Sequence, residues 1–185
     1  MPATSRRPTR ADLLAAVDRT VEDVIAPELK VLFCGINPGL YSAWTGHHFA
    51  RGGNRFWPAL HAAGFTPRVL APAEERLLLE RGYGVTNVVR RTTATAAELS
   101  RAELERGGRA LEEKVLHFRP RFLAILGIGA YRSAFSQPHA ALGLQPEAIG
   151  ETRIWVLPNP SGLNAHYPLA ALADLLRQLR IAGES

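Results

Sequence analysis

The sequence predicts an α/β protein with three layers, α/β/α, in which a central, largely parallel sheet lies between helices. Short apolar runs have the length and composition of buried strands. Segments with helical periodicity separate these runs, and a strand, a crossing helix and a second strand normally give parallel pairing. The chain has 185 residues, 46% of them apolar, which is enough for one core. We therefore expect residues 1–185 to form a single domain.

The first half of the chain is predicted to hold one strand and three helices. Thr9 can cap a helix whose apolar residues recur at helical spacing until Pro27 stops it. A long Gly-rich and aromatic segment follows the strand, and a structureless loop of such length in a compact domain is usually functional. In order, we expect a helix at 9–27, a strand at 29–34, a loop at 35–54 and helices at 55–63 and 72–81.

The second half of the chain alternates between strands and helices. Ser100 and Glu103 have the spacing of a capping box, in which each side chain bonds the backbone of the other. Leucines near the C-terminus recur at helical spacing and mark an amphipathic helix. In order, we expect a strand at 83–89, a helix at 100–117, strands at 122–126 and 154–157, and a helix at 169–179.

Charge and cysteine content narrow the classes of function. The formal net charge is +5, which suits a polyanionic partner, and the basic segment 1–9 is expected to lie outside the folded core. The lone cysteine, Cys34, cannot form an internal disulfide or hold an iron–sulfur cluster or a structural zinc. No apolar stretch is long enough to span a membrane. We expect a cytoplasmic protein without a cofactor or a metal.

Two unusual loops follow predicted strands. Asn37 and Pro38 come directly after the first strand, and Asn159 and Pro160 come after the last one. Since ligands of an open parallel sheet bind beyond the carboxyl ends of its strands, both loops belong at the same edge. Proline fixes φ and glycine permits positive φ, so each loop can hold an amide group towards a ligand. Asn-Pro and Pro-Gly are also ordinary turn dipeptides.

Three motifs, in this order, resemble the mismatch-specific uracil/thymine-DNA glycosylase branch of the uracil-DNA glycosylase superfamily. They are Gly-Ile-Asn-Pro-Gly at 35–39, Asn-Arg-Phe-Trp at 54–57 and Asn-Pro-Ser-Gly-Leu at 159–163. The resemblance covers the chain from about residue 31 to the C-terminal helix. It implies an enzyme that acts as a monomer on double-stranded DNA containing G·U or related mismatches.

The resemblance also implies a role for individual residues. Asn37 positions the attacking water. From the chemistry of the reaction, the Asn159 carboxamide and the backbone amides of the turn at 35–39 can both donate to the leaving pyrimidine. The highly active uracil-specific branch has Asp and His at these two positions, which implies a slower enzyme here. The flipped base is bound by Ile36, Gly39, Ser42 and Phe49. The wedge that enters the duplex is formed by Gly162, Leu163 and Asn164.

The residue chemistry agrees with such a reaction. A base cannot be attacked within the helical stack, so the enzyme must extrude it, and an apolar residue such as Leu163 can fill the hole. As the glycosidic bond breaks, negative charge develops on the pyrimidine, and preorganised donors stabilise it. We predict a monofunctional glycosylase that excises uracil, with thymine or ethenocytosine as related substrates. Two alternatives stay open, a non-catalytic mismatch sensor and an α/β enzyme of free nucleotides.

Other polar residues near the motifs carry weaker expectations. His47 and His48 are adjacent and lack a nearby carboxylate in sequence, so we expect them to face solvent or DNA. Arg51, Arg55 and Arg68 flank the first motif and could contact phosphate. Solvated arginines are the simpler interpretation for this group.

Overall fold

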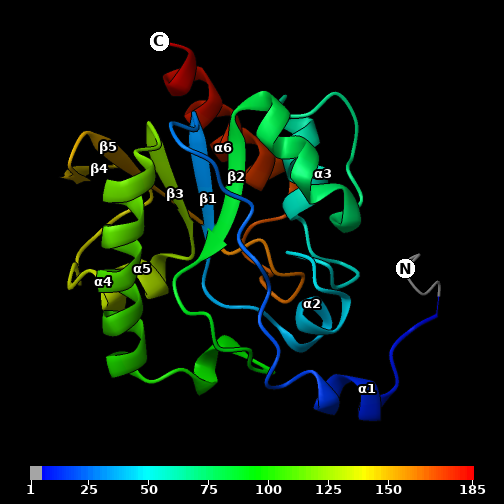
Figure 1. Cartoon of the computed structure of the whole chain (residues 1–185). Coiled ribbons are helices and arrows are strands. Elements are labelled where there is room, and N and C mark those ends of the chain that lie inside the picture. The colour runs from blue at the N-terminus through cyan, green and yellow to red at the C-terminus, as the bar shows by residue number, and fades with distance from the viewer. Residues whose placement is uncertain (1–5) are drawn as a thin grey trace.

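A computed structural model of the chain describes residues 6–185 and contains the predicted three layers (Figure 1). Of the basic segment expected at 1–9, residues 1–5 lie outside the described part. The sheet has five strands in the order β2-β1-β3-β5-β4, and every pairing is parallel except that of β4 with β5. The strands are β1 (Val31–Gly35), β2 (Tyr83–Asn87), β3 (Phe122–Leu126), β4 (Gly143–Ile149) and β5 (Thr152–Leu157).

Helices cover both faces of the sheet. On one face, α3 (Phe56–Ala62) packs against α6 (Leu169–Glu184), and on the other α4 (Arg101–Phe118) packs against α5 (Ile128–Ala134). The two apolar clusters arise because successive side chains of a strand point to opposite faces. Within β1, the buried Phe33 belongs to the cluster beneath α3 and α6, and the buried Leu32 belongs to the cluster beneath α4 and α5.

The N-terminal helix is much shorter than predicted. Thr9 caps α1 (Arg10–Ala15) as expected, but the helix ends there, and after a turn at 16–18 the chain has no regular structure as far as Val24. Val24 then pairs with Val85 in an antiparallel bridge, with backbone N···O distances of 2.9 and 2.8 Å. The prediction of a helix to residue 27 is wrong because Val24 is buried beside the edge strand β2, where that pairing satisfies an otherwise open edge.

Most other elements follow the predicted order, but several differ from the prediction. The segment at Pro72–Arg81 is a 3₁₀ helix, η1, and β2 ends two residues before the predicted boundary at 89. The long loop contains a short helix, α2 (Leu40–Thr45). The helix α5, the antiparallel strand β4 and the 3₁₀ turn η2 (Ala96–Glu98) were not predicted. In β4 only Gln145 and Ile149 are buried, so its pattern lacks a strong apolar alternation.

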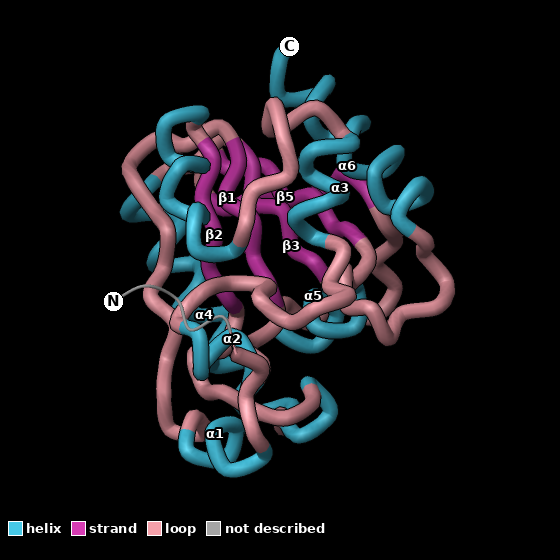
Figure 2. The backbone as a smooth tube through the Cα atoms, turned by 90° about the vertical axis from the view of Figure 1, so that its right-hand side faces the viewer, coloured by secondary structure: helices cyan, strands magenta, loops and turns pink. Residues whose placement is uncertain are grey.

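The loops after β1, β2 and β5 gather at the carboxyl end of the parallel strands. Figure 2 shows these loops, with α1 and α2, beyond one end of the sheet, while the C-terminus leaves from the other. The register aligns Gly35 at the end of β1 with Asn87 at the end of β2. Within residues 6–185, no helix is long and apolar enough to cross a membrane.

Candidate active site

A pocket of about 560 Å³ opens at this carboxyl edge. The last residues of β1, β2 and β3, which are Gly35, Asn87 and Leu126, form part of its lining. Asn159 and Ser161 line it from the loop after β5. The two loops singled out in the sequence therefore meet at one concave site, as expected for ligands of an open parallel sheet.

Asn37 lies in this pocket with one end of its carboxamide fixed. Its Nδ2 donates to the backbone oxygen of Arg91 at 2.9 Å and to Thr93 Oγ1 at 2.7 Å. A carbonyl oxygen can only accept, so the group that faces Arg91 must be the amino group. Thr93 donates its own hydroxyl to the oxygen of Thr95 at 2.7 Å, which leaves it free to accept from Asn37. The Asn37 oxygen is consequently the end available to a ligand.

The Asn159 carboxamide is held by its oxygen, whereas that of Asn37 is held by its amino group. Its Oδ1 accepts the backbone N–H of Ser161 at 2.9 Å, which is a local turn between a side chain and the backbone two residues on. A backbone N–H can only donate, so the group that it meets must be the carboxamide oxygen. The Asn159 amino group is therefore the end available to the pocket. One asparagine can offer an acceptor and the other a donor.

Phe49 lines the same pocket in a strained backbone conformation. Its φ is 51°, which is uncommon for a bulky residue other than glycine. Phe56 backs its ring, with centroids 4.1 Å apart and planes inclined by 32°. The ring edge reaches the floor of the pocket, where a Cβ on Gly35 would lie 3.2 Å from Phe49 Cζ. Strain of this kind persists where the surroundings determine the conformation, often at functional sites.

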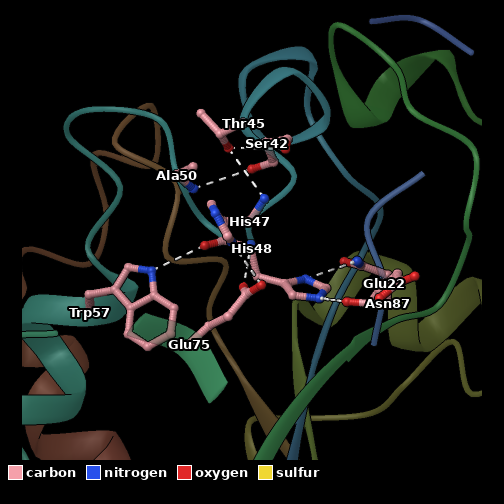
Figure 3. A network of polar contacts seen from close by, with 9 residues as sticks. All are labelled: Glu22, Ser42, Thr45, His47, His48, Ala50, Trp57, Glu75 and Asn87. Atoms are coloured by element: carbon pink, nitrogen blue, oxygen red, sulfur yellow. Dashed lines mark hydrogen bonds and ion pairs between the residues drawn. The ribbon is translucent and has the colours of Figure 1, made fainter. Parts of the chain in front are cut away.

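The other three residues expected to bind the base also line the pocket, in different ways. The Ile36 side chain packs towards the cluster beneath α4 and α5, since its Cδ1 would lie 3.0 Å from a Cβ on Gly127. Ser42 is buried and its Oγ accepts the N–H of Ala50 at 3.2 Å, so it ties α2 to the loop that follows (Figure 3). Gly39 is exposed at the start of α2, with open space around it.

The predicted wedge residues lie together at the mouth of the pocket. Leu163 is 76% exposed and also contributes to the lining. Gly162 approaches the neighbouring loop so closely that a Cβ there would lie 2.7 Å from the Gly53 oxygen. Asn164 turns inward, because its Nδ2 donates to the backbone oxygen of Asn159 at 3.1 Å. Leu163 is thus the tip of this loop, and Asn164 braces it.

Arg55, in the motif at 54–57, holds the loop at 159–164, which carries the predicted wedge residues and is called the wedge loop below. Its Nη1 donates to the backbone oxygens of Ser161 at 3.1 Å and Asn164 at 2.8 Å, and its N–H donates to the Pro160 oxygen at 2.9 Å. The Arg55 guanidinium therefore joins the motif at 54–57 to the motif at 159–163. The other two arginines of this group differ, because Arg68 pairs with Glu74 on the surface whereas Arg51 lies exposed at the pocket.

The expectation for the two histidines is wrong for His48. Its side chain is buried, with only 3% of the residue exposed, whereas the His47 side chain is 31% exposed and meets Glu75 Oε1 at 3.1 Å. His48 is held by its backbone as well, because its N–H donates to Glu75 Oε2 at 2.8 Å and its oxygen accepts from Trp57 Nε1 at 3.1 Å (Figure 3). The sequence showed no carboxylate nearby because Glu75 arrives from η1.

Asn87 is a polar pocket residue that the sequence motifs did not include. It ends β2 and is buried beside Gly35, with its Nδ2 3.4 Å from His48 Nδ1. The signal that could have found it is its position, since a polar residue ends an otherwise apolar strand at the edge where ligands bind. Four carboxamides line the pocket, those of Asn37, Asn54, Asn87 and Asn159, and the oxygen of Asn54 accepts the backbone N–H of Phe56 at 2.9 Å.

The arrangement suits the chemistry of a flat, polar, aromatic ring. Aromatic stacking, which Phe49 can provide, and hydrogen bonds from carboxamides are the interactions that fix such a ring in a pocket. Burial lowers the pKa of the His48 side chain, and the coulombic effects of Glu75 and Asp23 oppose this only in part. The ring of His48 is therefore neutral at neutral pH. The side chains that the asparagines and His48 offer to the pocket are therefore uncharged, and Arg51 is a cation in its lining.

Comparisons with known proteins show which fold and which family the chain has. The solution NMR structure of a protein from Methanosarcina acetivorans, provisionally assigned as a uracil DNA glycosylase, shares the fold. The two chains superpose with a TM-score of 0.57 at 19% identity, over 88% of this chain and 98% of the other. A model of the uracil DNA glycosylase superfamily matches residues 22–180, which include all three motifs and the whole sheet. The chain belongs to the uracil DNA glycosylase superfamily, and it is a DNA glycosylase.

Proposed function

We propose that this glycosylase flips uracil out of duplex DNA and hydrolyses its N-glycosidic bond, with mismatched thymine or ethenocytosine as secondary substrates. The observation that carries the proposal is that Asn37 and Asn159 have opposite polarity in one pocket, which means that Asn37 leaves its carboxamide oxygen free and Asn159 leaves its amino group free. The free oxygen of Asn37 can accept a hydrogen bond from water, and the free amino group of Asn159 can donate to a pyrimidine oxygen. Both interactions favour hydrolysis of a base that has a carbonyl next to its glycosidic nitrogen.

The bond changes follow from these roles. As the bond between C1′ and the pyrimidine N1 breaks, its electron pair leaves with the base, and the oxygen of water forms a new bond to C1′. Asn159 stabilises the negative charge that develops on the pyrimidine. Asn37 orients the water but cannot take its proton, because a carboxamide is not a base in this pH range. That proton passes to the departing base or to bulk water, and the products are free base and an abasic site.

Flipping is assigned to Leu163 and to the loop that carries it. Extruding a base costs a few kcal/mol in lost stacking and pairing, and the cost is smallest for a mismatched pair. An exposed apolar side chain at the pocket mouth can occupy the space that the base leaves. Since an amide-only site has less catalytic power than one with ionisable groups, we expect the enzyme to favour pairs that open easily.

The reaction is proposed to stop at the abasic site. An enzyme that also cleaves the strand forms a Schiff base with the sugar through an amine. Among the described residues, none of those that line the pocket is a lysine. Strand breaks should therefore appear only after alkali.

One panel of duplexes tests the proposal. Each duplex carries a single uracil, thymine or ethenocytosine opposite guanine or adenine, and both free base and alkali-induced breaks are measured under single-turnover conditions. We expect uracil release to be fastest opposite guanine, to persist in the presence of a chelator, and to give no breaks without alkali. Tight binding of the mismatched duplexes with no base released from any of them would instead identify a non-catalytic sensor.

A further inference from the structure

The segment between β2 and α4 supplies both partners of the Asn37 amino group. This segment, residues 88–100, leaves the carboxyl end of the sheet and leads to the first turn of α4 (Figure 1). Asn37 Nδ2 donates to the backbone oxygen of Arg91 at 2.9 Å and to Thr93 Oγ1 at 2.7 Å. The direction of the Asn37 oxygen therefore depends on where these two acceptors lie.

The two acceptors are held in different ways. Thr93 is tied to the loop after β1 through its backbone, because its N–H donates to the Pro38 oxygen at 3.2 Å. The backbone of Arg91, in contrast, forms no hydrogen bond with another backbone group within residues 6–185. The next residue, Thr92, is held by its side chain, whose hydroxyl donates to the Arg19 oxygen at 2.6 Å. Side chains thus anchor this part of the segment.

The Arg91 side chain reaches the start of α4. Its Nε lies 2.7 Å from Glu103 Oε1 and its Nη2 lies 3.1 Å from Glu103 Oε2, so two bonds join the planar groups. The same Nη2 donates to the Glu98 oxygen at 3.3 Å. The hydrogen bonds from Arg91 and from the Ser100 N–H lower the pKa of the Glu103 carboxyl to about 2. Glu103 is therefore a carboxylate at neutral pH.

Glu103 is itself fixed by the helix. Its Oε2 accepts the N–H of Ser100 at 2.9 Å, and its own N–H donates to Ser100 Oγ at 3.1 Å, which completes the capping box. One turn further along, a Cβ on Gly107 would lie 2.4 Å from the Val88 oxygen, so α4 also touches the beginning of the segment. Because Leu111 buries α4 in the core, Arg91 is attached to a rigid element.

We infer that Arg91 and Glu103 are positioning residues, whose ion pair holds the backbone oxygen that orients the Asn37 carboxamide. Neither side chain lines the pocket, so the pair acts through Asn37 and not on the base. The inference rests on the proposed function, because it explains how the same site keeps an acceptor directed at the attacking water.

Removing the ion pair should slow base release without weakening DNA binding. Arg91→Met keeps most of the length of the side chain but loses the bonds to Glu103 and Glu98. We expect single-turnover release of uracil from a G·U duplex to fall about fivefold, which is near the upper limit for one ion pair at a surface. The Kd for that duplex should change by less than about twofold. An unchanged rate in Arg91→Met would overturn the inference.

A second variant separates the ion pair from the helix cap. Glu103→Gln can still accept the N–H of Ser100, since glutamine also completes a capping box, but it offers Arg91 no charge. We expect a loss of about threefold in the same assay, smaller than in Arg91→Met because one neutral hydrogen bond can remain. A wild-type rate would assign the role of Glu103 to the cap alone.

The same change in an Asn37→Ala background shows whether Arg91 acts through Asn37. With the carboxamide gone, Arg91→Met should lower the residual rate by less than about twofold, because effects that pass through one group do not add. An arginine that gripped phosphate instead would weaken duplex binding and slow both backgrounds equally. That result would overturn the inference.

Arg101→Met is the matched control. Arg101 lies in the first turn of the same helix and pairs with Glu105 at 2.9 Å, but this pair has no contact with the segment that holds Asn37. Its rate of uracil release should stay within about twofold of wild type, as for most surface substitutions. Equal losses in Arg101→Met and Arg91→Met would show a general effect of charge on α4.

A further measurement does not depend on activity. Nitrogen-15 NMR resolves the side-chain amino group of Asn37, and its hydrogens should exchange with water about threefold faster or more in Arg91→Met than in wild type, because one acceptor becomes mobile. Arg101→Met should leave this exchange unchanged. Equal exchange in Arg91→Met and wild type would overturn the inference even if uracil is released. If wild type releases no uracil, the proposed function fails, while the exchange rates still decide whether Arg91 holds Asn37.

Discussion

The loops that follow β1 and β5 use the same side chain in opposite ways. Asn37 commits its amino group to Arg91 and Thr93 and leaves an oxygen, whereas Asn159 commits its oxygen to Ser161 and leaves an amino group. The residue type is identical, and only the partner differs. A pair of neutral carboxamides can thus provide both the acceptor that orients water and the donor that stabilises the leaving base.

The two loops also differ in how far away their partners lie. Asn159 meets a residue two positions ahead, so its polarity is a local property of an Asn-Pro-Ser turn. Asn37 meets residues 54 and 56 positions away, which arrive only when β2 pairs with β1. The orientation of the Asn37 acceptor therefore depends on the fold, whereas the orientation of the Asn159 donor is set within one short segment.

The largest expected effect is the loss of Asn37. Asn37→Ala removes the acceptor that orients water, and general catalytic groups of this kind contribute about 10²- to 10⁴-fold. We expect uracil release from a G·U duplex to fall by about 10³-fold in single-turnover assays. Binding to the same duplex should change less than about threefold, because Asn37 does not grip the DNA. A variant that retains full activity would place the water elsewhere.

A smaller loss is expected for Asn159. Asn159→Ala removes one donor to the developing charge, which typically costs about 10²-fold in rate. The control is Asn159→Gln, which retains an amino group but displaces it and cannot repeat the short turn with Ser161. We expect the glutamine variant to be slow as well, since position and donor are both needed. A rate for Asn159→Ala equal to wild type would show that the donor comes from another group.

Much of the fold could be predicted from the sequence, but the site could be predicted only in part. The runs that became β1, β3 and β5 are apolar and short, and the capping box at Ser100 starts α4 as expected. The first helix was predicted too long because Val24 fits helical spacing but is buried against β2, with which it pairs. Periodicity cannot distinguish these two ways of burying a valine.

The motifs identified the loops but not the contacts between them. Asn87, His48 and Glu75 meet only through tertiary structure, so no local pattern linked them. Arg55 was expected at most to contact phosphate, yet its guanidinium donates to the wedge loop. An arginine has five donors, so its side chain can contact either a phosphate or the backbone oxygens of a neighbouring loop, and only the fold shows which of these it does.

Breaking the brace between the two motifs should have a moderate effect. Arg55→Met keeps much of the length of the side chain but removes its bonds to Ser161 and Asn164. We expect the ratio of duplex to single-stranded uracil release to fall about tenfold, since a loosened loop costs on the order of one strong hydrogen bond. Arg68→Met is the control, because Arg68 pairs with Glu74 at the surface. Equal ratios of duplex to single-stranded uracil release in Arg55→Met and Arg68→Met would contradict a bracing role for Arg55.

The smallest effect is expected at the tip of the wedge. Leu163→Ala shortens an exposed side chain without disturbing the loop behind it. Processing of a well-paired U·A duplex should fall about fivefold, consistent with roughly 1 kcal/mol of lost apolar contact. Single-stranded substrate, in which no stacking resists flipping, should be processed at the wild-type rate. Equal losses on both substrates would contradict the wedge.

The opposite polarity of the two asparagines is tested most directly by placing aspartate at each position. Asn37→Asp keeps an oxygen towards water, so it should be faster than Asn37→Ala, although it loses the bonds to Arg91 and Thr93. Asn159→Asp puts a negative oxygen beside the leaving base, so it should be slower than Asn159→Ala. The measurement is single-turnover uracil release from one G·U duplex by all four variants. The account predicts an aspartate-to-alanine rate ratio above one at position 37 and below one at position 159, and ratios on the same side of one would contradict it.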